Sequence, residues 1–216
     1  MKKIITILTL IISINSVGQK NYLSIGNATN GLCFGNSTQF NGVRFNVIDK
    51  NCFKNNGFNL SLISESQLTN GVNLGLLSAT HELVNGINIG GLFSSGSFNG
   101  MSITGFMSMS SKINGIGISG INSGDTLNGL MIGLWTIYAN KAINGLAIST
   151  FFVHAQQLSG VSFTLLKNEF TIQKGLSFSL FNDAKELHGV QIGLINYAGN
   201  NRRFLRWTPL INFNFK

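Results

Sequence analysis

A tandem repeat with a nearly constant period constrains the fold of this chain more than any other feature. Most copies read Asn-Gly, an apolar residue, a small or polar residue, a second apolar residue and then Gly, Ser or Thr, as in Asn85-Gly86-Ile87-Asn88-Ile89-Gly90. A fixed period of this kind is typical of architectures in which each copy is one structural unit. Eleven anchor glycines mark the copies at nearly equal steps: Gly42, Gly57, Gly71, Gly86, Gly100, Gly115, Gly129, Gly145, Gly160, Gly175 and Gly189.

Within each copy the residues alternate as they do in a β-strand. With the anchor glycine as position 0, positions +1, +3 and +6 are apolar, position +2 is mostly small or polar, and position −2 is apolar in most copies. Positions +1 and +3 face the same side of a strand, but +6 would face the opposite side if the strand ran straight on. A glycine often stands at +4, between +3 and +6. A glycine at this point predicts that the strand bends there, and Asn-Gly predicts a second bend in each copy. We expect the apolar side chains to point inward throughout.

This pattern predicts an all-β fold, namely a β-solenoid of about eleven 14–16-residue rungs with N- and C-terminal caps. One rung cannot bury its own apolar face, whereas stacking places each residue above its equivalent and makes the core continuous. The asparagines at position −1 are then expected to form a ladder of side-chain hydrogen bonds along the stack. Asn30-Gly31-Leu32 is a further copy, and it is irregular because Gly31 stands closer to Gly42 than the period requires.

The alternative is a 12-stranded outer-membrane β-barrel. The repeat length fits a membrane strand of about 9–11 residues plus a tight turn, and Pro209–Phe215 alternates and ends on aromatic residues as a closing strand would. However, three outward positions on a tilted strand cover only about 15 Å of the roughly 25 Å apolar belt. The sequence therefore favours the solenoid.

The N-terminus predicts an exported protein. Lys2 and Lys3 precede an apolar run, residues 4–12, and small residues follow up to Gly18. This order is typical of a secretory signal peptide, here residues 1–18. We assign residues 19–41 to an N-terminal lead-in or cap, residues 42–196 to the repeat domain, and residues 197–216 to a C-terminal cap or closing strand. In an oxidising compartment Cys33 and Cys52 could form a disulfide, or they are two small buried residues.

No catalytic, cofactor-binding or metal-binding residues stand out, and we expect no enzyme activity and no cofactor. The three histidines and seven carboxylates are scattered, and no nucleophile motif or metal-ligand spacing is present. The one basic-aromatic cluster consists of Arg202, Arg203, Arg206 and Trp207. It suits an anionic partner or a membrane interface, or it is an ordinary solvated cap. The net charge of +8 is too dispersed to predict nucleic-acid binding.

The phrase from His188 to Ala198, His-Gly-Val-Gln-Ile-Gly-Leu-Ile-Asn-Tyr-Ala, together with the earlier Asn-Gly copies, resembles a bacterial family of exported surface-repeat proteins. Proteins of that family carry tandem copies of the phrase apolar-Asn-Gly-apolar-Gln-apolar-Gly-Leu. The resemblance covers roughly residues 40–198, and in this chain only Gln191 supplies the glutamine of that phrase. It implies location at the cell surface or outer membrane of a Gram-negative bacterium, and no reaction. We therefore expect a structural or binding role, with an unidentified surface ligand or protein partner. The alternative function is an integral outer-membrane β-barrel acting as a small pore or assembly component.

Overall fold

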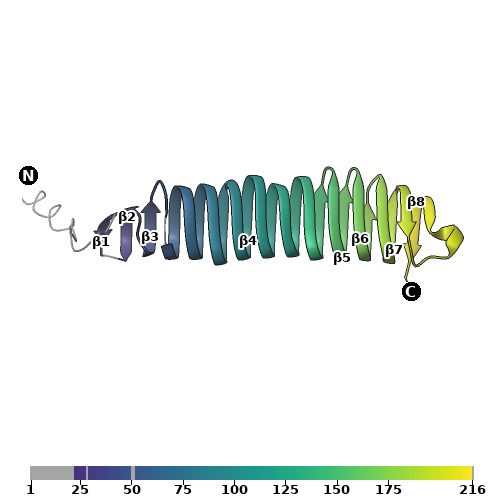
Figure 1. Ribbon diagram of the computed structural model, residues 1–216, viewed down its shortest axis with the longest axis horizontal. Coiled ribbons are helices and arrows are strands. Elements are labelled where there is room, and N and C mark those ends of the chain that lie inside the picture. The colour runs from purple at the N-terminus through teal and green to yellow at the C-terminus, as the bar shows by residue number, and fades with distance from the viewer. Residues whose placement is uncertain (1–21, 28, 50–51, 216) are drawn as a thin grey trace, which may run out of the picture. The chain divides into compact units, whose positions relative to one another are not determined.

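The computed structural model describes residues 22–27, 29–49 and 52–215, nearly all of them in β-strands (Figure 1). The predicted signal peptide lies outside the described residues. Among those residues, no helix is long and apolar enough to cross a membrane. The elements are β1 (Tyr22–Gly26), β2 (Asn30–Gly35), β3 (Gln39–Phe45), β4 (Cys52–Ser149), β5 (Phe152–Thr164), β6 (Lys167–Phe178), β7 (Phe181–Ala198), the 3-10 turn η1 (Arg203–Leu205) and β8 (Trp207–Asn214).

The chain divides into two compact units, unit 1 (Met1–Gly96) and unit 2 (Ser97–Lys216), and β4 contributes residues to both. Within each unit neighbouring rungs run parallel and in register. In unit 1, Gly31 pairs with Gly42, which pairs with Gly57. In unit 2 the same alignment joins Gly145, Gly160, Gly175 and Gly189 in turn. This confirms the predicted β-solenoid and contradicts the barrel alternative, in which consecutive strands would run antiparallel.

The anchor glycines are required by the backbone. All eleven have φ between 113° and 157°, a conformation that other residues rarely adopt. At Gly129, for example, φ is 113° and a Cβ atom would overlap the carbonyl oxygen of Gly115 in the neighbouring rung. The repeat therefore keeps glycine both for its dihedral angle and for the close approach of two rungs.

The predicted ladder of position −1 asparagines is confirmed in both units. Each side-chain amide donates to the side-chain oxygen of the asparagine one rung earlier, at 2.5 to 2.9 Å. In unit 1 the ladder joins Asn30, Asn41, Asn56, Asn70 and Asn85. In unit 2 it joins Asn99, Asn114, Asn128 and Asn144, and Ser159 follows at the next rung.

The expectation that positions +1, +3 and +6 point inward is wrong. Ile87 and Ile89 are 38% and 40% exposed, whereas Asn88 between them is fully buried. The same holds at Ile148, 37% exposed, beside the buried Ala147. On this side of the rung the side chain at +2 points into the interior, and the apolar side chains at +1 and +3 stand outside. Of the four apolar columns, only −2 points inward; in unit 2 it contains the fully buried Phe98, Ile113, Leu127, Ile143, Leu158 and Leu187.

Each unit carries one antiparallel strand at an end of its parallel stack. In unit 1, β1 pairs antiparallel with β2, while β2 is already part of the parallel stack. In unit 2, β8 pairs antiparallel with β7 and carries the single proline, Pro209. A proline cannot donate a ladder hydrogen bond, so a strand that contains one discourages further pairing at a sheet edge.

Candidate functional site

The outward apolar side chains of unit 2 form a continuous surface, which we call the outer apolar face. It consists of positions +1 and +3 of seven rungs. Strand register places equivalent side chains of the last four rungs above one another, and the asparagine ladder joins the first four. The rings of Phe163 and Phe178, for example, stack with centroids 4.6 Å apart. None of these fourteen positions is charged. They are Met101, Ile103, Ile116, Ile118, Leu130, Ile132, Leu146, Ile148, Val161, Phe163, Leu176, Phe178, Val190 and Ile192.

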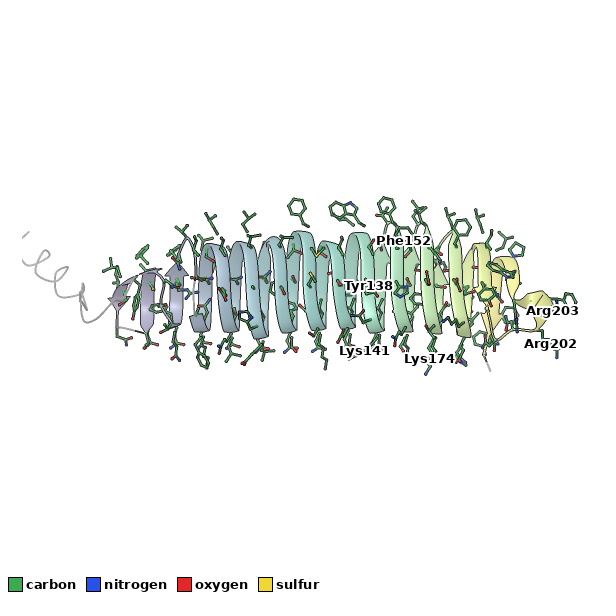
Figure 2. The ribbon with its side chains drawn as sticks, viewed as in Figure 1. Tyr138, Lys141, Phe152, Lys174, Arg202 and Arg203 are labelled. Carbon is green, nitrogen blue, oxygen red and sulfur yellow. The ribbon has the colours of Figure 1, made fainter. Side chains whose placement is uncertain are left out.

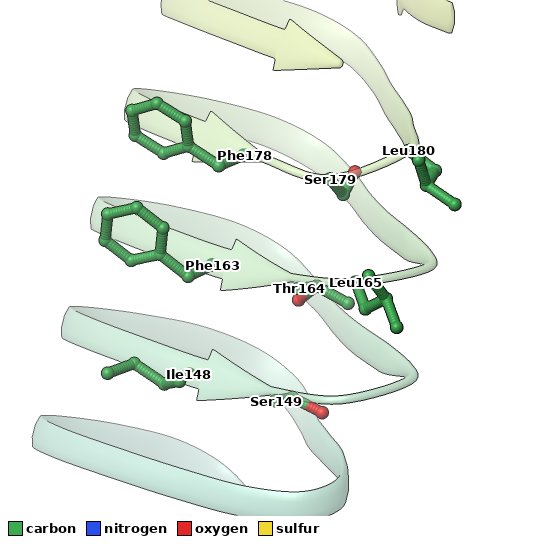
Figure 3. Close-up of a pocket in the computed structure, with 8 residues that line it drawn as sticks. All are labelled: Ile148, Ser149, Phe163, Thr164, Leu165, Phe178, Ser179 and Leu180. Atoms are coloured by element: carbon green, nitrogen blue, oxygen red, sulfur yellow. The ribbon is translucent and has the colours of Figure 1, made fainter. Parts of the chain in front are cut away.

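A shallow groove extends this face around the next corner of the rungs. It is lined by residues of three neighbouring rungs, and Figure 3 shows the two phenylalanine rings on one side and Leu165 and Leu180 on the other. Serine and threonine side chains lie between them. Beyond the groove, position +6 presents further exposed large side chains, among them Phe106, Trp135, Phe151 and Phe181 at 41% to 60% exposure. The apolar surface of unit 2 therefore covers a face and an edge.

The other surface of unit 2 carries the charged side chains, together with a few exposed aromatic ones such as Phe152. Figure 2 shows Tyr138 on this face and Lys141 and Lys174 along its edge. Strand register aligns Tyr138, His154, Glu169 and Asp183 on four neighbouring rungs, and the first two rings stack at 5.0 Å. The charges and the aliphatic residues thus lie on different faces of the same rungs.

Sequence reasoning selected no carboxylate pair, and the structure places Glu169 beside Asp183 on neighbouring strands. The Lys167 ammonium, 2.7 Å from the Glu169 carboxylate, lowers the pKa of Glu169. Burial raises the pKa of Asp183. Both lie on an open face, and no described residues form a cluster of three metal-ligating side chains. Of the other histidines, His81 contacts Glu65 at 3.2 Å and His188 lies 3.9 Å from Glu186.

The predicted basic-aromatic cluster is brought together at one turn between β7 and β8. Arg202, Arg203, Arg206 and Trp207 are all exposed. Arg203 is the first residue of η1, and Arg202 and Arg206 flank it. Figure 2 shows Arg202 and Arg203 at this end of unit 2. The structure adds a residue that sequence reasoning missed: Phe204, in the middle of the turn, is 93% exposed. The sequence could have indicated Phe204 by its position between Arg202-Arg203 and Arg206-Trp207. We call residues 201–207 the C-terminal tip.

Unit 1 contains a buried ionic cluster that the sequence did not reveal. Arg44 and Asp49 are fully buried and form an ion pair at 2.7 Å. Arg44 also donates to Asn59 at 2.9 Å and to the sulfur of Cys52 at 3.1 Å. Cys33 and Cys52 are free and buried, and burial raises the pKa of both thiols. Arg44 is the only charged residue at any +2 position of the eleven copies, a signal that could have been read.

Comparisons of the chain with known protein families, curated proteins and solved structures found no match. In unit 2, large apolar side chains are exposed together on the outer apolar face and at the C-terminal tip.

Proposed function

We propose that the protein is an exported cell-surface repeat protein with a structural role, in which the outer apolar face of unit 2 packs against the same face of a second copy. The observation that carries this proposal is the outward orientation of the apolar columns at +1 and +3. If the protein worked as a monomer in water, we would expect the rungs to turn these side chains inward and bury them. Their exposure here indicates a surface that another molecule covers.

The size of the face suits a dimer. Four of the fourteen apolar side chains, Ile148, Phe163, Leu176 and Ile192, are 37% to 41% exposed, and the other ten are partly exposed. Together they leave on the order of 700 Å² of surface in contact with water. The largest apolar patch of a typical monomer is about 300–600 Å². A stable interface of standard size buries about 800 Å² on each partner. The face therefore supplies one half of such an interface.

A second copy is the partner whose shape matches best. Rungs repeat at about 4.8 Å, so the face is a set of parallel ridges with that spacing. An identical face has the same ridges, and two such faces can interdigitate along their length as stacked sheets do. Because the face carries no charged residue, no buried charge has to be compensated.

Export is supported by the predicted signal peptide, and location at the cell surface by the resemblance of the repeat. Expression in a Gram-negative host followed by mass spectrometry of the mature protein tests the first. We expect an N-terminus at Gln19 and protection of the protein from cytoplasmic protease. An intact N-terminus at Met1 in the cytoplasm would contradict export.

Sedimentation velocity tests the dimer. We expect the wild type to associate at micromolar concentration and the variant Ile118→Lys/Ile148→Lys to be monomeric, because two lysines would be buried without partners. The matched control is Gln156→Lys/Thr171→Lys, which adds the same charge at exposed positions away from the face. It should associate like the wild type.

A monomeric wild type at tens of micromolar, or equal association of the two lysine variants, would contradict the proposal. A wild type that stays in solution only with detergent, and that the face variant makes soluble without it, would assign the face to lipid instead. Far-ultraviolet circular dichroism should show the same strand content in all variants, because every substitution lies on the outside of a rung.

A further inference from the structure

The C-terminal tip presents a large apolar group to solvent. Phe204 is 93% exposed, Leu205 55% and Trp207 63%. Aromatic side chains of this size usually bury most of their surface, since leaving one in water forgoes much of the free energy of burial. Three apolar side chains exposed at one turn therefore indicate a contact with another phase or molecule.

The exposure does not come from a loosely held loop. The Leu205 backbone amide donates to the Arg202 carbonyl at 2.7 Å, which closes η1. The Asn212 side-chain amide donates to the carbonyls of Leu205 and Arg206 at 3.5 and 3.3 Å. Arg206 in turn donates to the carbonyl of Asn201 at 3.3 Å. The backbone is thus fixed on both sides of Phe204, and its ring is held outward before any partner arrives.

The charges around this ring have one sign. Arg202, Arg203 and Arg206 flank it, and in the described part of the chain none of them forms an ion pair with a carboxylate. Trp207 packs against Tyr197 with ring centroids 4.7 Å apart. Guanidinium groups bind phosphates, and indole and phenol rings favour the boundary between headgroups and acyl chains.

We propose that the C-terminal tip docks on an anionic phospholipid membrane, with Phe204 inserted between headgroups and the three arginines on the lipid phosphates. The Phe204 ring and the arginines are both needed, because stable membrane attachment takes an apolar anchor together with basic charge. The tip is separate from the outer apolar face, so this proposal does not depend on the dimer.

Vesicle flotation of the purified full chain tests the proposal. We expect binding to vesicles of phosphatidylcholine mixed with phosphatidylglycerol, and little binding to phosphatidylcholine alone. Each basic residue near an anionic surface contributes about a five-fold increase in partition, so Arg202→Gln/Arg203→Gln should bind roughly thirty-fold more weakly. Phe204→Ser should bind about ten-fold more weakly to the anionic vesicles, because the inserted ring is lost.

The control is Lys112→Gln/Lys174→Gln, which removes the same charge from exposed positions elsewhere in unit 2. It should keep nearly wild-type binding. Equal loss in the control would overturn the proposal in favour of diffuse attraction by net charge, and so would absence of vesicle binding by the wild type. Sedimentation of the tip variants separates the two proposals, since the tip variants should still dimerise.

Discussion

The two units share one backbone repeat but fill their interiors differently. Among the described residues, unit 1 buries five hydrophobic side chains, Cys33, Phe40, Cys52, Val84 and Phe93, whereas unit 2 buries fifteen. The buried polar residues are nearly equal in number, fifteen against sixteen. The interior of unit 1 therefore depends on hydrogen bonds, and that of unit 2 on hydrogen bonds plus apolar packing.

The polar interior of unit 1 is a connected network. Asn59 donates to Asn73 at 2.8 Å, and Asn73 donates to Asn88 at 2.8 Å. At one end of this network Arg44 donates to Asn59. Because both interiors accompany the same in-register stacking, the fold is set by the strand ladder and its anchor glycines. The interior filling is the variable part, and it should determine the stability of each unit.

The largest expected effect is in unit 1. Asp49→Asn leaves the buried Arg44 without a counter-charge and should cost about 3–5 kcal/mol. Hydrogen exchange of peptides from residues 40–65 should rise steeply. Both tryptophans, Trp135 and Trp207, lie in unit 2, so their fluorescence reports unit 2. The free energy of unfolding of unit 2, measured from this fluorescence, should fall less than the free energy of opening of unit 1, measured from hydrogen exchange. Equal losses in the two units would mean that the two interiors do not differ in stability.

The next effect is in the apolar interior of unit 2. Leu127→Ala removes a fully buried side chain and should cost about 2–5 kcal/mol in urea unfolding followed by tryptophan fluorescence. Leu134→Ala, the same change at a side chain that is 58% exposed, should cost less than about 0.5 kcal/mol. Similar losses in the two variants would contradict the assignment of inside and outside.

Substitution of an anchor glycine should affect either unit alike. Gly129→Ala in unit 2 forces a side chain into a positive φ and against the carbonyl of the neighbouring rung, and should cost at least about 2 kcal/mol. Gly105→Ala is the control, since a Cβ there meets no atom within 4 Å. It should leave the urea midpoint unchanged or raise it slightly. A tolerated Gly129→Ala would break the claim that anchors define the fold.

The smallest effect concerns the asparagine ladder that the two units share. Asn70→Ala in unit 1 and Asn128→Ala in unit 2 each interrupt one partly buried ladder and should each cost about 1 kcal/mol. Hydrogen exchange in the neighbouring rungs checks both. A much larger loss in one unit would show that the ladder, and not only the interior, distinguishes them.

The sequence predicted the repeat unit, the solenoid, the corners and the asparagine ladder, because each follows from a period or from a residue with a narrow conformational range. It misled on orientation. Alternation shows that neighbouring residues face opposite sides, but not which side is inside. The prediction places the apolar set inside, whereas amides such as Asn88 hydrogen-bond from rung to rung and occupy the interior. The tip arginines were recognised from charge, whereas the exposure of Phe204 depends on the geometry of η1.

The most direct test of this account is thiol labelling of two neighbouring positions. Cys33 and Cys52 are buried and should react slowly, so single substitutions Ala147→Cys and Ile148→Cys can be compared in the wild-type background. We predict that Ile148→Cys reacts rapidly with maleimide when the protein is dilute and is protected at concentrations where the dimer forms, whereas Ala147→Cys is protected throughout. Rapid labelling at 147 with protection at 148 in dilute protein would show that the rungs are turned the other way and that the outer apolar face does not exist.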